Sequence, residues 1–291
     1  MKSRCIVVLA LAAVAAEAQQ KIEVKTTSAV ADGRVVIDSQ AGTIHVVGWA
    51  RDEVEVGGTL GRGAEAVNLN SHGARTDVEV ETMGNPHGVR SDLEIKVPAA
   101  SQVEIDSFSA DVKVEGVTGR VRIETVNGGL AVSGPAQEID AQSVNGRVDI
   151  AGACPRIHAE SVNGAVTIKG ARGEIEASTV NGRLVVSGDA FQKGSLSGVS
   201  GSVQFEGALA ERGWLEVETV SGGVELRLPA TVSAEFNVSS FSGGIENELG
   251  PPARKTGHYT PEQELRFTTG SGGARVSVKT LSGSINLLKQ R

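Results

Sequence analysis

The residues of this chain that could do chemistry stand in two columns of a repeated segment, each made of side chains 18 positions apart. The columns are Arg122, Asp140, His158 and Glu176, and next to them Glu124, Gln142, Glu160 and Ser178. Glycoside-cleaving β-helices need two carboxyl groups at a fixed separation on one exposed groove. Glu160 and Glu176 could come near one another, but both columns mix charge and residue type. We therefore interpret the columns as a solvated face of a sheet and expect no catalytic residue in them.

Metal and cofactor chemistry has no recognisable motif in this sequence. The five histidines are His45, His72, His87, His158 and His258. They are widely separated, and none has a partner at the spacing of metal ligands. No Gly-Lys-Ser or Gly-Lys-Thr is present to hold a phosphate, and the repeats lack the aspartate of calcium-binding rolls. We expect no metal, no cofactor and no cofactor-binding residue.

Cysteine chemistry is limited to one residue once the segment 1–18 is set aside. Cys5 lies within that segment, which leaves Cys154 alone in the remainder of the chain. An exported chain with one thiol cannot form an internal disulfide, so its stability must come from packing and hydrogen bonds. We interpret Cys154 as an ordinary turn or core thiol, with an intermolecular bridge or a reactive thiol as the alternative.

The elements that must position these side chains are short strands of an 18-residue unit, written four times between Val121 and Gly188. Each unit has an Asn-Gly corner, and we predict that these corners stack into a structural ladder with glycine at a positive φ angle. The ladder residues are Asn127, Gly128, Asn145, Gly146, Asn163, Gly164, Asn181 and Gly182. A fixed period of this kind is typical of units that bury their apolar faces by stacking on their neighbours.

The repeat predicts an all-β protein, a parallel β-solenoid (β-helix) with coils of about 18 to 21 residues. Asn-Gly between alternating strands also suits two-residue hairpins, so an antiparallel β-hairpin repeat array is the alternative. The residue before each corner is always apolar, and we expect it to be buried, which requires the bend of a solenoid coil. These residues are Val126, Val144, Val162, Val180, Val199, Val220, Phe241 and Leu281.

The chain divides into three parts by pattern. Residues 1–18 are typical of a signal peptide, with a basic start, an apolar run and a small-x-small cleavage site at Ala16-Glu17-Ala18. We expect irregular N-terminal β coils over 19–98 and regular β-solenoid repeats over 99–291. Within these parts, Gly57 to Ala74, Thr82 to Arg90 and Gly250 to Tyr259 are predicted as loops. The last strand ends in Lys289, Gln290 and Arg291, a polar finish suited to covering the open end of the array.

The ordered set of motifs resembles a bacterial putative-adhesin domain family of unknown function with β-strand repeats. The motifs are the signal peptide, Gly-x-Ile-x-Val-x-Gly-Trp at Gly42 to Trp49, Leu-x-Ile-x-Val-Pro at Leu93 to Pro98, and the serial Val-Asn-Gly or Val-Ser-Gly corners. The resemblance implies an exported, repetitive β-protein associated with the cell envelope, and it carries over no active site.

These observations predict a non-enzymatic exported protein, envelope-associated or secreted, that serves as an adhesion or scaffold module. We expect a periplasmic or extracellular location, and as partner an extended envelope polysaccharide or another protein. The net charge of −7 argues against nucleic acid as an electrostatic partner, and no transmembrane segment is expected in the mature chain. A homo-oligomer joined through its coil ends is a further expectation. The alternative is a polysaccharide-active β-helix enzyme with a site in the loops that break the repeat.

Overall fold

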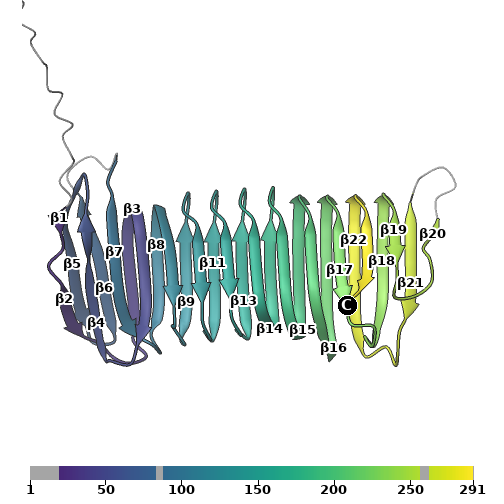
Figure 1. Ribbon diagram of the computed structural model, residues 1–291, viewed down its shortest axis with the longest axis horizontal. Coiled ribbons are helices and arrows are strands. Elements are labelled where there is room, and N and C mark those ends of the chain that lie inside the picture. The colour runs from purple at the N-terminus through teal and green to yellow at the C-terminus, as the bar shows by residue number, and fades with distance from the viewer. Residues whose placement is uncertain (1–19, 83–87, 256–261, 291) are drawn as a thin grey trace, which may run out of the picture.

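The molecule is a row of strands stacked along one axis (Figure 1). The computed structural model describes residues 20–82, 88–255 and 262–290, and these contain strands and turns but no helix. The predicted signal peptide therefore lies outside the described residues. Within the described part, no helical segment has the length and apolar character needed to cross a membrane.

The centre of the array consists of coils whose strands pair in parallel with the coils before and after. On one side lie β9 (Arg120–Thr125), β11 (Glu138–Ser143) and β13 (Arg156–Ser161); on another lie β10 (Leu130–Ser133) and β12 (Val148–Ala151). Ile139 pairs with Val121 on one side and with Ile157 on the other, so equivalent residues of adjacent coils are direct neighbours. The all-β, solenoid-like fold is confirmed, and the central strands do not form the antiparallel hairpins of the alternative.

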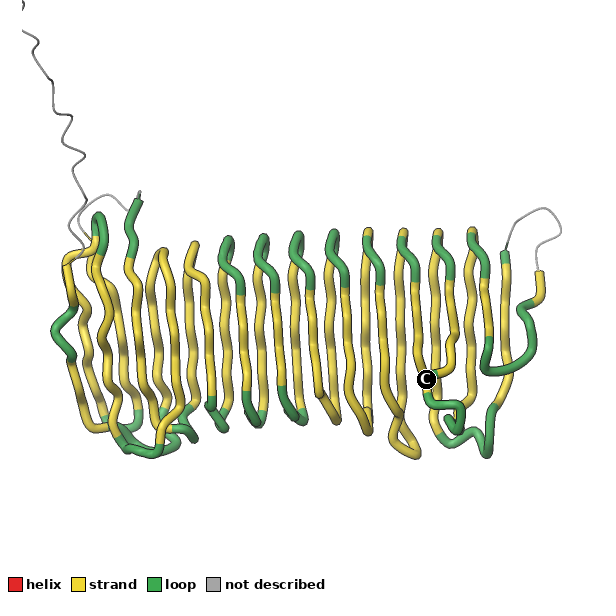
Figure 2. The backbone as a smooth tube through the Cα atoms, viewed as in Figure 1, coloured by secondary structure: helices red, strands yellow, loops and turns green. Residues whose placement is uncertain are grey.

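Three long strands continue the array, and each runs through more than one side of its coil. They are β14 (Val166–Thr179), β15 (Leu184–Ser200) and β16 (Val203–Ser221). Leu184 pairs with Val203 and Val203 with Val224, so the spacing between paired residues widens toward this end. Turns lie along the edges of the array, where the chain passes from one side of a coil to the next (Figure 2).

At the N-terminal end the order in space differs from the order in sequence. The strands are β1 (Gln20–Lys21), β2 (Lys25–Ser28), β3 (Arg34–Trp49), β4 (Glu53–Leu60), β5 (Ala64–His72), β6 (Arg75–Thr82), β7 (Ser91–Pro98) and β8 (Gln102–Glu115). Strand β3 lies between β8 on one side and β6 with β7 on the other, and it is parallel to all three. Strands β4 and β5 run antiparallel to β7 and β6 and cover this end.

The prediction of a loop from Gly57 to Ala74 is wrong over most of its length, because β4 extends to Leu60 and β5 begins at Ala64. The glycines that suggested a loop serve a close approach of two strands instead. Gly58 has a φ of +127°, and a Cβ built there would lie 2.0 Å from the carbonyl oxygen of Asp92. Glycine is the residue that tolerates both conditions. The second predicted loop is described only in part, since residues 83–87 lie outside the described residues.

The C-terminal end repeats this change of order. Its strands are β17 (Val224–Leu228), β18 (Ala234–Ser242), β19 (Ile245–Asn247), β20 (Arg254–Lys255), β21 (Gln263–Thr268), β22 (Ala274–Ser282) and β23 (Ile285–Lys289). Strand β22 pairs with β16 on one side and β18 on the other, and β23 likewise lies between β17 and β19. The last coil of the sequence is therefore inserted inside the array (Figure 1).

The expectation that the last strand covers the open end is accordingly wrong. That place belongs to β21, which pairs antiparallel with β18 and with the short β20. The third predicted loop, Gly250 to Tyr259, is described only as far as Lys255, since residues 256–261 lie outside the described residues.

One continuous apolar core fills the array. Its inward columns include Val121, Ile139, Ile157 and Ile175, and next to them Ile123, Ala141, Ala159 and Ala177, all of them buried. Because the strands pair in register, each of these side chains lies next to its equivalent in the adjacent coil, within one core cluster. Burial of β-branched side chains in stacked columns supplies the main favourable term for folding.

Candidate functional site

The predicted corner asparagines form one row along an edge of the array. Asn145 Nδ2 donates to Asn127 Oδ1 at 2.8 Å, Asn163 donates to Asn145 at 2.7 Å, and Asn181 donates to Asn163 at 2.8 Å. The row ends at the Ser109 hydroxyl, which accepts from Asn127 Nδ2 at 3.2 Å. These asparagines are exposed. Each amide is partnered by its neighbours, so the row lines the surface without offering an acid, base or nucleophile.

The corner glycines are required for a different reason from the one predicted. None of Gly128, Gly146, Gly164 and Gly182 has a positive φ angle. A Cβ built on Gly146 would instead lie 1.8 Å from the carbonyl oxygen of Gly128, and one on Gly164 would lie 1.9 Å from that of Gly146. The backbones of successive coils come too close at this corner for any side chain, which is why glycine recurs there.

A row of hydroxyl groups beneath the glycines was missed at the sequence level. Ser143 Oγ donates to Gly128 O at 3.1 Å and accepts from Gly146 N at 2.9 Å. Ser161 makes the same two bonds in the next coil, at 2.9 Å each, and Thr179 at 3.1 and 3.0 Å in the one after. The sequence does contain a pattern that indicates this row, because a Ser or Thr stands two positions before every corner asparagine. These buried hydroxyls satisfy backbone groups that the tight corner leaves unpaired.

The apolar residue before each corner faces solvent, which corrects the prediction that it is buried. Val144 is 39% exposed, Leu281 is 54% and Phe241 is 50%. The strand keeps its alternation up to the corner, so the inward place goes to the Ser or Thr and the next side chain points outward. Val126 and Val162 are half-buried, and the other members of the set are exposed.

These residues are neighbours from coil to coil. Backbone amides of the corner asparagines bond to the carbonyl groups of Val126, Val144 and Val162 in the preceding coil, at 2.8 to 2.9 Å. Asn127 N bonds in the same way to Phe108 O at 3.0 Å, which adds Phe108 at 61% exposure. In spatial order the set is Phe108, Val126, Val144, Val162, Val180, Val199, Val220, Leu281 and Phe241. We call these nine residues the apolar ladder.

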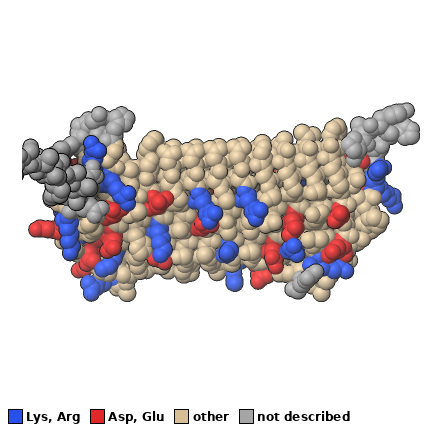
Figure 3. All heavy atoms as spheres, turned by 45° about the horizontal axis from the view of Figure 1, so that its top comes forward, with Lys and Arg blue, Asp and Glu red and all other residues tan. Residues whose placement is uncertain are grey.

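The apolar ladder is long and continuous. Strand spacing of about 4.8 Å over eight intervals gives a length of about 38 Å. Single exposed apolar side chains are common on soluble proteins, but a contiguous apolar patch of this length marks an interaction surface. Figure 3 shows that the upper edge of the array is free of Lys, Arg, Asp and Glu over most of its length, with the charged side chains gathered below it.

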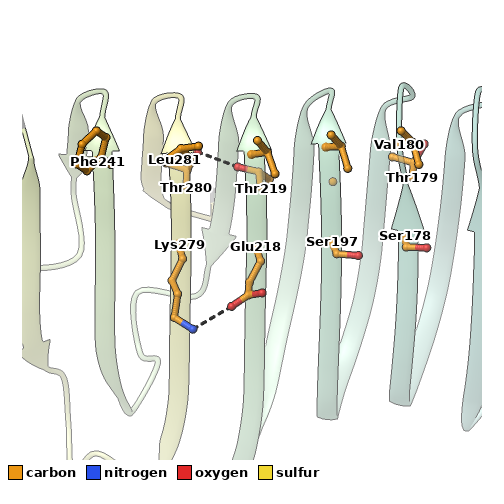
Figure 4. Close-up of a pocket in the computed structure, with 13 residues that line it drawn as sticks. Ser178, Thr179, Val180, Ser197, Glu218, Thr219, Phe241, Lys279, Thr280 and Leu281 are labelled. Carbon is orange, nitrogen blue, oxygen red and sulfur yellow. Dashed lines mark hydrogen bonds and ion pairs between the residues drawn. The ribbon is translucent and has the colours of Figure 1, made fainter.

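A shallow groove runs beside the C-terminal half of the apolar ladder. It has a volume of about 590 Å³, and Val180, Val199, Val220, Leu281 and Phe241 form its apolar side. Its floor includes Ser178, Ser197, Glu218 and Lys279, of which the last two are paired at 2.9 Å (Figure 4). Gly198 takes the inward place that Thr179 and Thr219 hold in the adjacent coils. A second groove of about 390 Å³ lies beside Val126, Val144 and Val162.

The outward charged columns behave as a solvated sheet face. Arg122 pairs with Asp140 at 3.1 Å and with Glu124, and His158 lies 3.8 Å from Glu176 and 4.0 Å from Glu160. Exposed pairs of this kind contribute little to stability.

One carboxyl of this face is perturbed. Partial burial raises the pKa of Asp106, and the nearby carboxylates of Glu124, Glu104 and Asp38 raise it further, while Arg122 opposes them. A carboxyl kept protonated to a higher pH is a feature that acid catalysis can use. Arg122 is committed to ion pairs, however, and the groove that holds Asp106 mixes both signs of charge.

The remaining candidates for chemistry are placed as follows. Cys154 is buried, and desolvation raises the pKa of its thiol, whose Sγ lies 3.1 Å from the carbonyl oxygen of Arg156. It is thus a core thiol with its reactive form disfavoured. Among residues 20–82, 88–255 and 262–290, no group of three or more His, Cys, Asp or Glu side chains is arranged to hold a metal ion.

Comparison with known proteins gives a match to a family model over part of the chain, and a fold. Residues 163–288 match the family model described as Toastrack DUF4097. A crystal structure of a protein named a putative adhesin from Parabacteroides merdae ATCC 43184 is similar, with 11% identity, a TM-score of 0.54 and coverage of 92% of this chain and 96% of that one. Another, named a putative adhesin from Parabacteroides distasonis ATCC 8503, has 14% identity, a TM-score of 0.43 and coverage of 92% and 98%. No curated protein matches the chain.

The resemblance to a putative-adhesin family of unknown function, which the corner motifs indicate, is confirmed by the family-model match over residues 163–288 and by the similarity to the Parabacteroides merdae structure. The likeness to the Parabacteroides merdae protein shows a shared fold.

Proposed function

We propose that this chain, which carries an adhesin-like domain of unknown function, is a non-enzymatic adhesion or scaffold module. In this proposal a solenoid with coils of about 18 to 21 residues holds an extended partner along the apolar ladder. The partner is an envelope polysaccharide or another protein whose length matches a surface of about 38 Å.

The observation that carries the proposal is the exposure of the apolar ladder. Nine coils place an apolar side chain at the same outward position, although that position is free of packing constraints from the core. Exposed valine, leucine and phenylalanine side chains cost solubility, so a contiguous set is expected only where a partner covers it. A flat surface without charges also suits contact with an uncharged, elongated molecule.

We further propose that the protein acts outside the inner membrane. The support is the signal-like sequence of residues 1–18 together with the family resemblance. The described residues contain one cysteine, which is buried, and the fold is held by packing and rows of hydrogen bonds. Such a fold needs no disulfide and is compatible with an oxidising compartment.

The polysaccharide-active alternative has less support. Its site was expected in the loops that interrupt the repeat, and the first of these is strand over most of its length. The charged columns hold ion pairs of both signs, in place of the two isolated carboxyl groups that glycoside cleavage uses.

Co-sedimentation tests the proposal. The protein, prepared from Gln19 onward, is spun with isolated cell-envelope material and with insoluble polysaccharides, while soluble sugar is measured in the same tubes. We expect binding without sugar release, and the fraction that binds identifies the partner class. Release of sugar, or failure to bind any envelope fraction, would overturn the proposed function.

A further inference from the structure

We propose that the apolar ladder is covered by the apolar ladder of a second copy of this chain, with the two arrays side by side and antiparallel. This inference rests on the proposed function, because it names the protein partner of the same surface. It replaces assembly through the coil ends with lateral pairing.

The charge distribution favours self-pairing at this surface. A two-fold axis places a surface against itself, so charged side chains would face like charges. The apolar ladder contains no charged residue, and the row beside it is asparagine in the central coils and serine at residues 200, 221, 242 and 282. The groove beside the C-terminal half of the apolar ladder carries Glu218 with Lys279 as a neutral pair, and the groove beside Val126, Val144 and Val162 carries the carboxyl groups of Asp106, Glu124 and Glu160. An antiparallel arrangement places the second groove of each copy opposite the first groove of the other, which keeps the three carboxyl groups of the two copies apart. Two copies can therefore approach along this edge without repulsion.

The spacing and order of the side chains also fit a second copy. Both arrays repeat at the same strand spacing of about 4.8 Å, so contacts stay in register along the full length. The large side chains lie at the two ends, with Phe108 at one and Leu281 and Phe241 at the other, and valines lie between them. An axis through Val180, the middle residue of the nine, places Phe108 of each copy against Phe241 of the other. The aromatic pairs then shield the valines between them from solvent.

The ends of the array are less suited to assembly. The outermost strands at the two ends include β5 and β21, and each runs antiparallel to the coil strand beneath it. A copy stacked on either strand would not continue the parallel, in-register columns of the core. Along the sides of the array, by contrast, equivalent residues of successive coils follow one another without interruption, so a second copy can contact them in register.

The area predicts a weak dimer. A strip about 38 Å long and about 12 Å wide buries about 900 Å² in total, below the roughly 1,200 to 2,000 Å² of typical stable complexes. We therefore expect a dissociation constant in the micromolar range or weaker, measurable by sedimentation over a wide range of concentrations.

Sedimentation of charge-swapped variants tests the pairing. The protein from Gln19 onward is used, because all described strands lie beyond that residue. We expect a monomer–dimer equilibrium, with the dissociation constant raised at least tenfold by Val180→Asp and by Val180→Lys. Mixing the two variants should restore the dimer, because opposite charges then meet at the axis. Val24→Asp is the control, since Val24 is 62% exposed but lies outside the apolar ladder.

Cross-linking tests the antiparallel arrangement. Val180→Cys should form a disulfide-linked dimer on mild oxidation, whereas Val126→Cys should cross-link only when mixed with Leu281→Cys. The buried thiol of Cys154 stays outside this reaction. Self-cross-linking of Val126→Cys would show parallel pairing and overturn the arrangement.

A wild-type chain that stays monomeric at all concentrations would overturn the inference of a second copy. Envelope binding by that monomer would leave the proposed function standing, with an envelope polysaccharide or a different protein covering the apolar ladder.

Discussion

Val144 and Val148 belong to the same coil, four residues apart, and lie on opposite sides of its wall. Val148 is 0% exposed and packs in the core, while Val144 is 39% exposed and belongs to the apolar ladder. The same contrast separates Val166, which is buried, from Val162, which is half-buried. Residue type therefore does not decide which valine supports the fold and which is free to bind. The Asn-Gly corner between them, with its buried hydroxyl, turns the chain and makes the difference.

A carboxylate placed on the inner side of this wall should destabilise the fold far more than one placed on the outer side. Val148→Asp would bury an unpaired carboxylate and should lower the free energy of unfolding by about 3 to 5 kcal/mol. Val144→Asp places the same carboxylate in solvent and should change stability by less than about 0.5 kcal/mol. Urea denaturation of the two variants measures both changes. Equal destabilisation would contradict the outward orientation of Val144.

The corner that separates the two valines can be tested next. Gly146→Ala forces a Cβ to within 1.8 Å of the Gly128 carbonyl oxygen, so the coils must shift apart. We expect a loss of about 1 to 3 kcal/mol, as for other overpacked sites.

Gly244→Ala is the matched control, because a Cβ built there meets no atom within 4 Å. Its φ angle also lies outside the positive range. Thermal melts of both variants should show a drop for Gly146→Ala only. A similar drop for Gly244→Ala would mean that conformational freedom, and not close approach, is what glycine supplies at these corners.

The smallest effect concerns the charged outer face. The pKa of Asp106 is raised above its ordinary value of 3.8 by partial burial and by Glu124, Glu104 and Asp38. A raised carboxyl pKa favours the folded state only while the group is protonated. That contribution is complete below the unfolded pKa and is lost as pH rises through the folded pKa.

Asp106→Asn removes the cost of ionising this group. We expect a small gain in stability at neutral pH, below about 0.5 kcal/mol because solvent screens the group, and no gain near about pH 3. Denaturation at the two pH values measures it. A gain in stability of equal size at both pH values would show that the charge of Asp106 is not its cause.

The sequence was most informative where each coil repeats the one before it. Ile139 and Ile157 could be placed in one column because the 18-residue period fixes both register and facing in a parallel sheet. The order of coils at the ends could not be predicted. Strand β22 lies between β16 and β18, although both precede it in the sequence, and its Ser-Gly corner would fit any position in the row. The residues of a strand do not by themselves indicate which strand, distant in sequence, it will pair with.

The corner residues were recognised, but two of their roles were not. The residue before each corner was expected inside because it is always apolar, yet the buried place at the corner belongs to Ser143 and its equivalents. Glycine was assigned a positive φ, whereas the distance between backbones decides its presence. Both roles depend on the neighbouring coil, which a single repeat unit does not show.

Whether the apolar ladder is the binding surface is decided by comparing one variant inside it with one outside it. Co-sedimentation with the envelope fraction that binds the wild type is measured for Val144→Asp and for Val24→Asp, each with an unchanged melting curve. We predict at least a tenfold loss of binding for Val144→Asp and wild-type binding for Val24→Asp. Wild-type binding by both variants would contradict the account and place the partner on another face of the array.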